Sequence, residues 1–453
     1  MSRFTQTKYV DSPFACADGN LLCSDHAFTV LRKAPLTREE KLEAYYYMLR
    51  QPFIKLCRLR FLNPDYSTAF SVDNNALNKR SGAFIADGTL TVNLQNGARR
   101  SLSVKFANVD EEFSYKVNKL WYGTKIALDE GLILPNGEEF YIQQGVFVLT
   151  NPEETVSPAE KSISYSLADK WANIDGTLYG NLEGTYEVPV NSHIFRPITA
   201  LFKEDRGNGE KVDPTTPVFT NYYNDKTQTA PDGRVFLFTQ TPYTLTLDGD
   251  SGTIADVVTG LSTMLNAWVG YDSSGALRIE ASQDDILDSD KAVLWEFRED
   301  ETVLLGLTYS YKNTEVYNDY IVVGEQMDDF SQPCGRAQNL DPASDTNIKL
   351  IGRKTFRESK PEFSTDTMCK DYAAWTLKRK AALQKAVTIS CGQLFHIQEN
   401  SLVTIVRSDK EGSPAERHLI MGFSRPLAST GAMSINAVSV NDFPNATITG
   451  WPE

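Results

Sequence analysis

Short runs in which apolar and polar residues alternate recur along the 453-residue chain, and they limit its possible folds most strongly. A period of two is typical of half-buried β-strands. Clear examples are residues 90–94, 102–106 and 163–167, and Pro-Asn-Gly at 135–137 separates two apolar runs as in a β-hairpin. We therefore predict a mainly β (α+β) fold with closed barrels or sandwiches.

The first 50 residues differ from this pattern. Residues 1–35 show no strong period, and we predict an extended arm. Thr37 and Glu40 form the pattern of a capping box, which predicts that a helix begins there. Its expected apolar face consists of Leu42, Tyr45, Tyr46 and Leu49. The sequence leaves open whether the arm and helix hold a neighbouring subunit or pack on their own domain.

The residue pattern in the middle of the chain predicts a small α/β unit. Residues 203–233 are polar and rich in turn residues, which indicates a long loop or a boundary. Thr253 and Asp256 predict the start of an amphipathic helix that Gly270 would end, before a turn and a strand. The expected apolar face of this helix consists of Ile254, Val257, Val258, Leu261, Leu265 and Trp268.

From about Leu307 the β pattern returns, interrupted by one long helix. We predict strands within 309–323 and 433–440, and an irregular loop at 327–347. Further strands are predicted at 387–389, 402–406 and 419–423. The long helix should begin near Ser364, Thr365 and Asp366, with a main apolar face at Met368, Tyr372, Trp375 and Ala382. A weaker stripe consists of Ala374, Leu377 and Ala381.

These patterns predict four parts: an arm and helix at 1–50, a first β-barrel domain at 51–195, an inserted α/β domain at 196–306 and a second β-barrel domain at 307–453.

The charge balance bears on possible partners. The chain has 59 Asp and Glu against 45 Lys and Arg, a net charge of -14, which opposes general binding to a phosphate backbone. Its first residues lack the apolar core of a signal peptide, and no apolar run approaches the length of a membrane span. We expect folding in a cytoplasm, no specific nucleic-acid binding and no stable membrane insertion.

The cysteines and histidines predict no metal or redox site. No cysteine pair has the C-x-x-C spacing of a zinc site, so we expect reduced, mostly buried thiols. The cysteines are Cys16, Cys23, Cys57, Cys334, Cys369 and Cys391. The only histidines in the sequence are His26, His193, His396 and His418.

Two motifs at residues 248–252 resemble functional loops. Gly-Asp-Ser-Gly at 249–252 is similar to the nucleophile loop of trypsin-like proteases, but no histidine has the sequence context that this family uses. A helix-loop-helix calcium loop that began at Asp248 would need Gly at its sixth position and Glu at its twelfth. This chain has Thr253 and Thr259 at those positions. We predict neither site, although a weak surface cation site here stays open.

Acidic clusters and one aromatic pair leave a carbohydrate function open. Acidic residues gather at 110–112, at 284–290 and at 328–329, and paired carboxylates can catalyse glycoside hydrolysis. Such runs are more typical of solvated loops. Trp121 and Tyr122 could stack on a sugar or simply belong to the core. We predict no enzyme activity, no catalytic residue, no metal and no cofactor.

The order of parts resembles that of the baseplate hub and tail-associated proteins of tailed bacteriophages. CKDYAAWTLKRKAALQKAVTIS at 369–390 is similar to the helix-to-strand passage of the second barrel in these hubs. Segments 394–407 and 418–426 resemble its closing strands, and 137–154 with 162–176 resemble the first barrel. Residues 253–280 resemble the inserted domain. The resemblance covers about residues 51–445 and rests on no single diagnostic residue.

This resemblance implies two tail-tube-like barrels in each chain and a homotrimeric ring with a channel for DNA. The implied partners are the tail tube protein, the distal tail protein, the tape measure protein and a distal spike or fibre. The implied location is the virion tail tip, after assembly in the host cytoplasm. Two other functions stay open: a β-sandwich that binds a glycan or receptor, and a carboxylate-dependent glycoside hydrolase.

Overall fold

The computed structural model describes most of the chain after the predicted arm. It describes residues 36–74, 85–107, 111, 113–114, 117, 120, 123–158, 161–229, 235–281, 293–311, 313–324, 326, 331–361, 363, 365–381, 385–407, 415–428, 431–440 and 443–450. The predicted arm at 1–35, the aromatic pair at 121–122 and the acidic positions 110, 112, 284–290 and 328–329 lie outside these residues.

Thirteen of the described β-strands form two lobes, and the prediction of a mainly β fold is confirmed. The strands of the first lobe are β1 (Lys55–Leu62), β2 (Thr68–Asp73), β3 (Ile85–Asn93), β4 (Arg100–Ala107), β5 (Lys125–Ile133), β6 (Glu139–Val156) and β7 (Lys161–Asp169). Those of the second lobe are β15 (Trp295–Arg298), β16 (Leu304–Tyr311), β20 (Lys385–Cys391), β21 (Leu402–Val406), β22 (Glu416–Pro426) and β23 (Met433–Ser439). The three alternating runs are β3, β4 and β7, and the Pro-Asn-Gly turn joins β5 to β6 as predicted.

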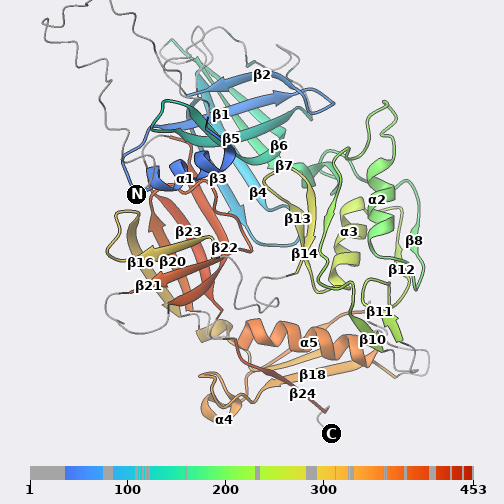
Figure 1. Ribbon diagram of the computed structural model, residues 1–453. Helices are drawn as coiled ribbons and strands as arrows, with labels where there is room; N and C mark the ends of the chain where they lie inside the picture. The colour runs from blue at the N-terminus through green and yellow to red at the C-terminus, as the bar shows by residue number, and fades with distance from the viewer. Residues whose placement is uncertain are drawn as a thin grey trace, which may run out of the picture.

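The two lobes are joined by hydrogen bonds into one sheet. Among the described residues this sheet has 13 strands in the order β16-β20-β23-β22-β3-β4-β7-β6-β5-β1-β2, with β21 and β15 branching from β22 (Figure 1). The sequence suggested two barrels joined only through an insert. A single buried apolar cluster includes Phe61 and Phe106 of the first lobe together with Phe297 and Ile389 of the second.

Strand β22 is the point where the sheet divides. Residues 416–419 pair with β21, while residues 422–426 pair with β3, and β23 lies along the opposite edge. The register shifts between Ile420 and Gly422, as in a β-bulge. A Cβ at Gly422 would collide with the backbone oxygen of Val92, so the close approach of β3 requires glycine here.

Helix α1 (Arg38–Met48) packs between the two lobes of its own chain (Figure 1). Thr37 and Glu40 form the predicted capping box. Tyr45 is fully buried, and its ring contacts Phe140 of the first lobe and Phe395 beside the second. Helix α1 therefore packs on both lobes of its own chain.

A separate α/β unit lies beside the lobes and has its own apolar core, which includes buried residues from Trp171 to Ala281. Its elements are η4 (Lys170–Asn173), β8 (Tyr186–Val188), α2 (Phe195–Lys203), β9 (Val218–Phe219), β10 (Thr227–Thr229), β11 (Val235–Leu237), β12 (Leu245–Leu247), α3 (Ile254–Thr263), β13 (Trp268–Tyr271) and β14 (Leu277–Glu280).

The predicted end of the helix in this unit was wrong. Helix α3 has the expected capping box at Thr253, but it ends at Thr263 and not at Gly270. Asn266 adopts a left-handed conformation with a φ of 50°, which breaks the helix. Trp268 then begins β13, which pairs with β14, so the apolar spacing that included Trp268 combined a helix with a strand.

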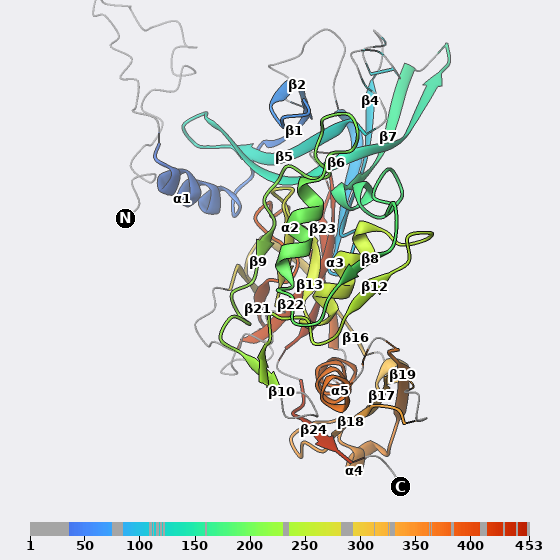
Figure 2. The ribbon, with the colours of Figure 1, turned by 90° about the vertical axis from the view of Figure 1, so that its right-hand side faces the viewer.

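A lower unit completes the described fold and lies at the bottom of both views (Figures 1 and 2). Its sheet has the order β19-β17-β18-β24 and is covered by α5. Its elements, with a short connecting turn, are η5 (Asn313–Glu315), β17 (Asp319–Val323), β18 (Cys334–Asn339), α4 (Ile348–Ile351), β19 (Thr355–Ser359), α5 (Asp366–Ala381) and β24 (Ala446–Thr449). Strand β18 contradicts the prediction that 327–347 is irregular throughout.

The predicted main face of α5 was wrong at two positions, whereas Met368 is buried as predicted and Ala382 lies outside the described residues. Tyr372 and Trp375 are only partly buried, whereas Cys369, Ala373 and Leu377 are completely buried against the sheet. Small side chains on this stripe let the helix approach the strands closely, so the bulky residues lie at the side of the contact. Ring size therefore does not identify the buried stripe of this helix.

The contact between α5 and β18 gives a first testable prediction. A Cβ at Gly335 would collide with backbone atoms of Cys369 and Lys370. Gly335→Val is expected to lower the free energy of unfolding by about 1–3 kcal/mol, because the helix must move away from the sheet. Urea denaturation would measure this loss. Gly306→Val is a matched control in β16 with open space around its Cβ, and an equal loss in both variants would contradict the prediction.

Candidate functional site at the junction of the two lobes

A buried ion pair connects the two lobes. Arg425 of β22 is fully buried, and its Nε donates a hydrogen bond to Glu130 Oε2 of β5 at 2.8 Å. Its Nη2 donates to Gln144 Oε1 at 2.6 Å, and its Nη1 donates to the carbonyl oxygen of Leu394 at 2.7 Å. Lys55 Nζ of β1 lies 2.9 Å from Glu130 Oε1. One carboxylate therefore has two buried cations as partners.

The charges at this ion pair keep Glu130 ionised. Burial alone would raise the pKa of the Glu130 carboxyl group, but Arg425 and Lys55 outweigh burial and lower the pKa below its usual value. Burial raises the pKa of the neighbouring Cys57 thiol, so this cysteine remains protonated. The group is arranged to hold strands together.

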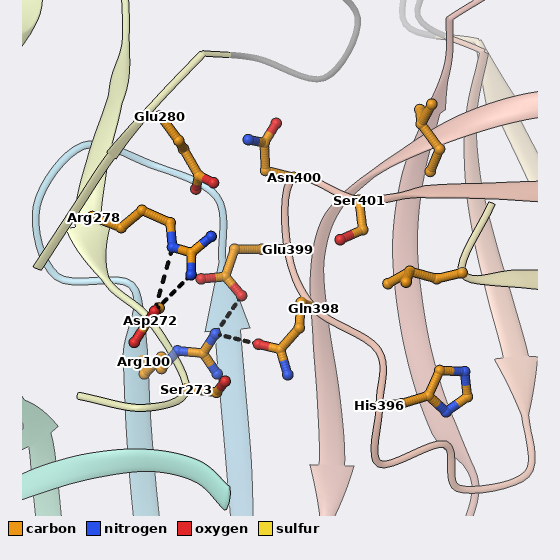
Figure 3. A pocket seen from close by; sticks show the side chains of 12 residues that line it. Arg100, Asp272, Ser273, Arg278, Glu280, His396, Gln398, Glu399, Asn400 and Ser401 are labelled. Carbon is orange, nitrogen blue, oxygen red and sulfur yellow. Dashed lines mark hydrogen bonds and ion pairs between the residues drawn. The ribbon is translucent and has the colours of Figure 1, made fainter. Parts of the chain in front are cut away.

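A second buried arginine lies where the first lobe, the second lobe and the α/β unit meet (Figure 3). Arg100 Nη2 donates to Glu399 Oε2 at 2.5 Å and to Gln398 Oε1 at 2.8 Å. Its Nη1 donates to the Gln144 carbonyl oxygen at 2.8 Å. Residues 398–399 precede β21, so a side chain at the start of β4 fixes a segment of the second lobe.

Arg99 adds the α/β unit to the same network. Its Nη1 donates to Glu280 Oε1 at 2.9 Å and lies 3.7 Å from Glu399 Oε1. The backbone N–H groups of Arg99 and Arg100 both donate to Asp169 Oδ2, at 2.7 and 3.0 Å. Burial raises the pKa of Asp169 to about 6, although these donors act in the opposite direction.

A cleft of about 450 Å³ is bordered by Arg100, Glu280, Gln398 and Glu399. In Figure 3, Arg278 and Asp272 lie next to Arg100 and Glu399, and Arg278 Nη2 donates to Asp272 Oδ2 at 2.9 Å. His396 also lines the cleft, and burial lowers its pKa to about 4, so the ring is neutral near neutral pH. The cleft is charged, but the arginines named here are neutralised by carboxylates.

A third buried ion pair lies inside the α/β unit, where that unit follows β7 of the first lobe. Lys170, directly after β7, donates from Nζ to Asp213 Oδ1 at 2.7 Å, to Thr215 Oγ1 at 3.0 Å and to the Gly275 carbonyl oxygen at 2.8 Å. Tyr271 donates its hydroxyl to Asp213 Oδ2 at 2.7 Å. Burial lowers the pKa of Lys170 to about 8, with Asp213 partly offsetting that effect.

The geometry gives these charged groups a structural role. Each buried charge named above has an opposite charge or several hydrogen bonds, which is the condition for keeping it ionised inside a protein. Within the described part of the chain, no three His, Cys, Asp or Glu side chains form a group that could hold a metal ion. A further cleft of about 660 Å³, in the α/β unit, is lined by residues that include Tyr179, Tyr186 and Arg206.

The motif that resembled a protease or calcium loop is a turn before α3. Asp250 N–H donates to Asp248 Oδ1 at 3.1 Å, and Ser251 is exposed. His396 lies instead beside Tyr45, and His418 is buried in β22. Glu111, from the first acidic cluster, is exposed and lies 3.7 Å from Lys161. The structure does not bring these candidates together.

The buried network of charged side chains was not predicted from the sequence. Its signal was present in the strand periodicity: Arg425 stands two residues after buried Phe423, on the same side of β22, and Glu130 lies within an apolar strand. Charged residues at core-facing positions need partners, so these positions could have been singled out. Their partners could not, because they come from distant segments.

None of the described helices is both long enough and apolar enough to cross a membrane.

Comparison with solved structures shows that this chain has the fold of phage tail proteins. It is similar to the 43 kDa tail protein of prophage MuSo2 from Shewanella oneidensis, with a TM-score of 0.53 and 11% identity over 86% of this chain and 99% of that chain. It is also similar to the tail protein from Neisseria meningitidis, with a TM-score of 0.52 and 10% identity over the same shares. No protein-family model and no curated protein matches the sequence.

Proposed function

We propose that this chain is a structural hub or adaptor subunit of a phage tail tip or baseplate and that it acts without catalysis. The observation that carries the proposal is the fold shared with the two tail proteins over 86% of the chain. The buried ion pairs of Glu130, Arg100 and Arg99 support it, since they hold the lobes and the α/β unit in fixed orientations. A fixed shape is what an assembly subunit needs.

In this proposal three copies form a ring around a channel for DNA. The ring joins the tail tube protein to a distal spike or fibre, with the distal tail and tape measure proteins as further partners. The four-part division at residues 50, 195 and 306 remains part of the proposal. So does the location in the virion tail tip after assembly in the host cytoplasm.

Two physical features support a ring. Among the described residues the main sheet ends at β2 and β16, whose outer edges carry backbone groups that a neighbouring subunit can pair or cover. Heterologous contacts of this kind close into rings when the rotation between copies allows it. The net charge of -14 also suits a channel wall that does not retain DNA.

The expected result in solution is a trimer of three times 50.6 kDa, about 152 kDa, seen by light scattering and as a ring with a central opening in negative-stain images. A subunit that stays monomeric at every concentration, with and without the tail tube protein, would contradict the ring. Glycan binding by such a monomer would favour the β-sandwich receptor-binding alternative. Sugar release lost on substitution of one Asp or Glu would favour the hydrolase.

A further inference from the structure

The part of the lower unit furthest from the first lobe includes residues 348–357, which we call the basic tip (Figures 1 and 2). It contains α4, the turn after it and the first part of β19. In both ribbon views α4 lies at the lower end of the molecule, far from the first lobe (Figures 1 and 2). Neither of the two clefts described above contains a residue of the basic tip.

The basic tip exposes several apolar side chains close together in sequence. Leu350 is 69% exposed, the largest fraction among the exposed large hydrophobic side chains of the described residues. Its neighbour Ile351 is 45% exposed, and Phe356 in β19 is 37% exposed. Scattered single apolar residues are ordinary on protein surfaces, whereas two adjacent aliphatic side chains on one short helix form a contact point.

The charge of the basic tip is opposite to that of the whole chain. Residues 348–357 contain Lys349, Arg353, Lys354 and Arg357 and no acidic residue, in a chain whose net charge is -14. Lys349 is exposed beside Leu350, and the Arg353 side chain is 57% exposed, with Asp319 Oδ2 at 3.9 Å from its Nε. Leu350 and Ile351 therefore lie between basic residues, with Lys349 before them and Arg353 and Lys354 after them in the sequence.

One buried side chain, Asn318, holds the basic tip in place. Asn318 is fully buried, and its Nδ2 donates to the carbonyl oxygens of Thr346 at 3.0 Å and Gly352 at 2.8 Å. Its Oδ1 accepts a hydrogen bond from the backbone N–H of Lys354 at 2.7 Å. One side chain thus fixes both ends of α4, so Leu350 and Ile351 are presented on a rigid support.

We propose that the basic tip binds the surface of a membrane that contains anionic phospholipids. Aliphatic side chains can enter the boundary between headgroups and acyl chains, while adjacent Lys and Arg side chains pair with lipid phosphates. Hot spots in protein–protein interfaces are typically aromatic or Arg side chains that fill pockets. The most exposed large hydrophobic side chain of the described residues is instead the aliphatic Leu350, which favours a lipid surface over a protein pocket. The contact is peripheral and needs no segment that crosses the bilayer.

The test uses the full chain and vesicles of phosphatidylglycerol or phosphatidylcholine in a sedimentation assay. We expect binding to the phosphatidylglycerol vesicles, little binding to phosphatidylcholine, and weaker binding as salt is added. Leu350→Ser with Ile351→Ser should weaken binding about tenfold, because two aliphatic side chains no longer leave water. Lys349→Gln with Arg353→Gln should weaken it by a similar factor.

The matched control is Leu305→Ser with Val156→Ser, since these two apolar residues are 62% and 68% exposed but lie outside the basic tip. This control should bind vesicles as the unmodified chain does, and circular dichroism should show that all variants are folded. Absence of binding to phosphatidylglycerol vesicles would overturn the proposal, and so would equal binding by both tip variants. A change in oligomer mass without any vesicle binding would instead assign the tip to a protein contact.

Discussion

Glu130→Ala is expected to lower the free energy of unfolding by about 3–5 kcal/mol. The side chains of Glu130, Lys55 and Arg425 are all almost fully buried, so the variant leaves two cations in the interior without their carboxylate. The cost comes mainly from these uncompensated charges, because the alanine itself fits a strand. Chemical denaturation followed by tryptophan fluorescence would measure the loss.

The matched control for this variant is Glu296→Ala, which removes a carboxylate from an exposed pair with Arg298 in β15. That substitution is expected to leave the denaturation midpoint unchanged, because exposed ion pairs contribute little. A midpoint for Glu130→Ala equal to that of the control would show that the buried ion pair does not hold the lobes together.

The same ion pair predicts a response to acid. The pKa of Glu130 is lower in the folded chain than in the unfolded chain, so its contribution to stability is complete above the usual carboxyl pKa. That contribution is lost as the pH falls through the lowered value. Wild type and Glu130→Ala should therefore approach each other in stability as the solution becomes strongly acidic.

Lys170→Met is expected to lower the free energy of unfolding by a similar amount, about 3–5 kcal/mol. Methionine fills much of the same volume, but Asp213 then keeps a buried negative charge without its cation. Exchanging both partners, as Lys170→Met with Asp213→Leu, should recover much of the loss, since an apolar pair of similar size needs no compensation. Denaturation of both variants at neutral pH would measure this, and a double variant no more stable than the single one would contradict it.

Lys170 also predicts a response to base. Its pKa of about 8 in the folded chain is below the ordinary value of 10.5, so the unfolded chain binds more protons between these values. The contribution of Lys170 to the free energy of unfolding of the wild type should therefore rise as the pH increases from about 8 to 10.5. The variant Lys170→Met should lack this rise. Equal pH profiles for the two proteins would contradict the assignment.

The local features of the fold could be predicted from the sequence. Alternation identified β3, β4 and β7, and the capping boxes at Thr37 and Thr253 placed two helix starts correctly. These signals succeed because a cap or a period depends on residues a few positions apart. The chain beyond α3 was harder, because Trp268 continues a helical spacing after Asn266 has already ended the helix.

Features that depend on distant partners could not be predicted. Arg425 reaches Glu130 across 295 positions, and Arg100 reaches Glu399 across 299. The division of the sheet at β22 has the same origin, because β3 and β21 approach one strand from separate parts of the chain. Cys369 and Ala373 of α5 were overlooked because they are small, and only the position of Gly335 explains why small residues are needed there.

Strand β22 has a mechanical consequence. Hinges between domains usually lie in loops whose backbone angles can change freely, whereas β22 passes from one lobe to the other with ladder partners on both sides of Gly422. A force along β22 that separated the two lobes would act at once on several of the hydrogen bonds that β22 makes with β21, β23 and β3. The two lobes should therefore move together as one rigid body, and any bending of the chain under tension should occur outside β22.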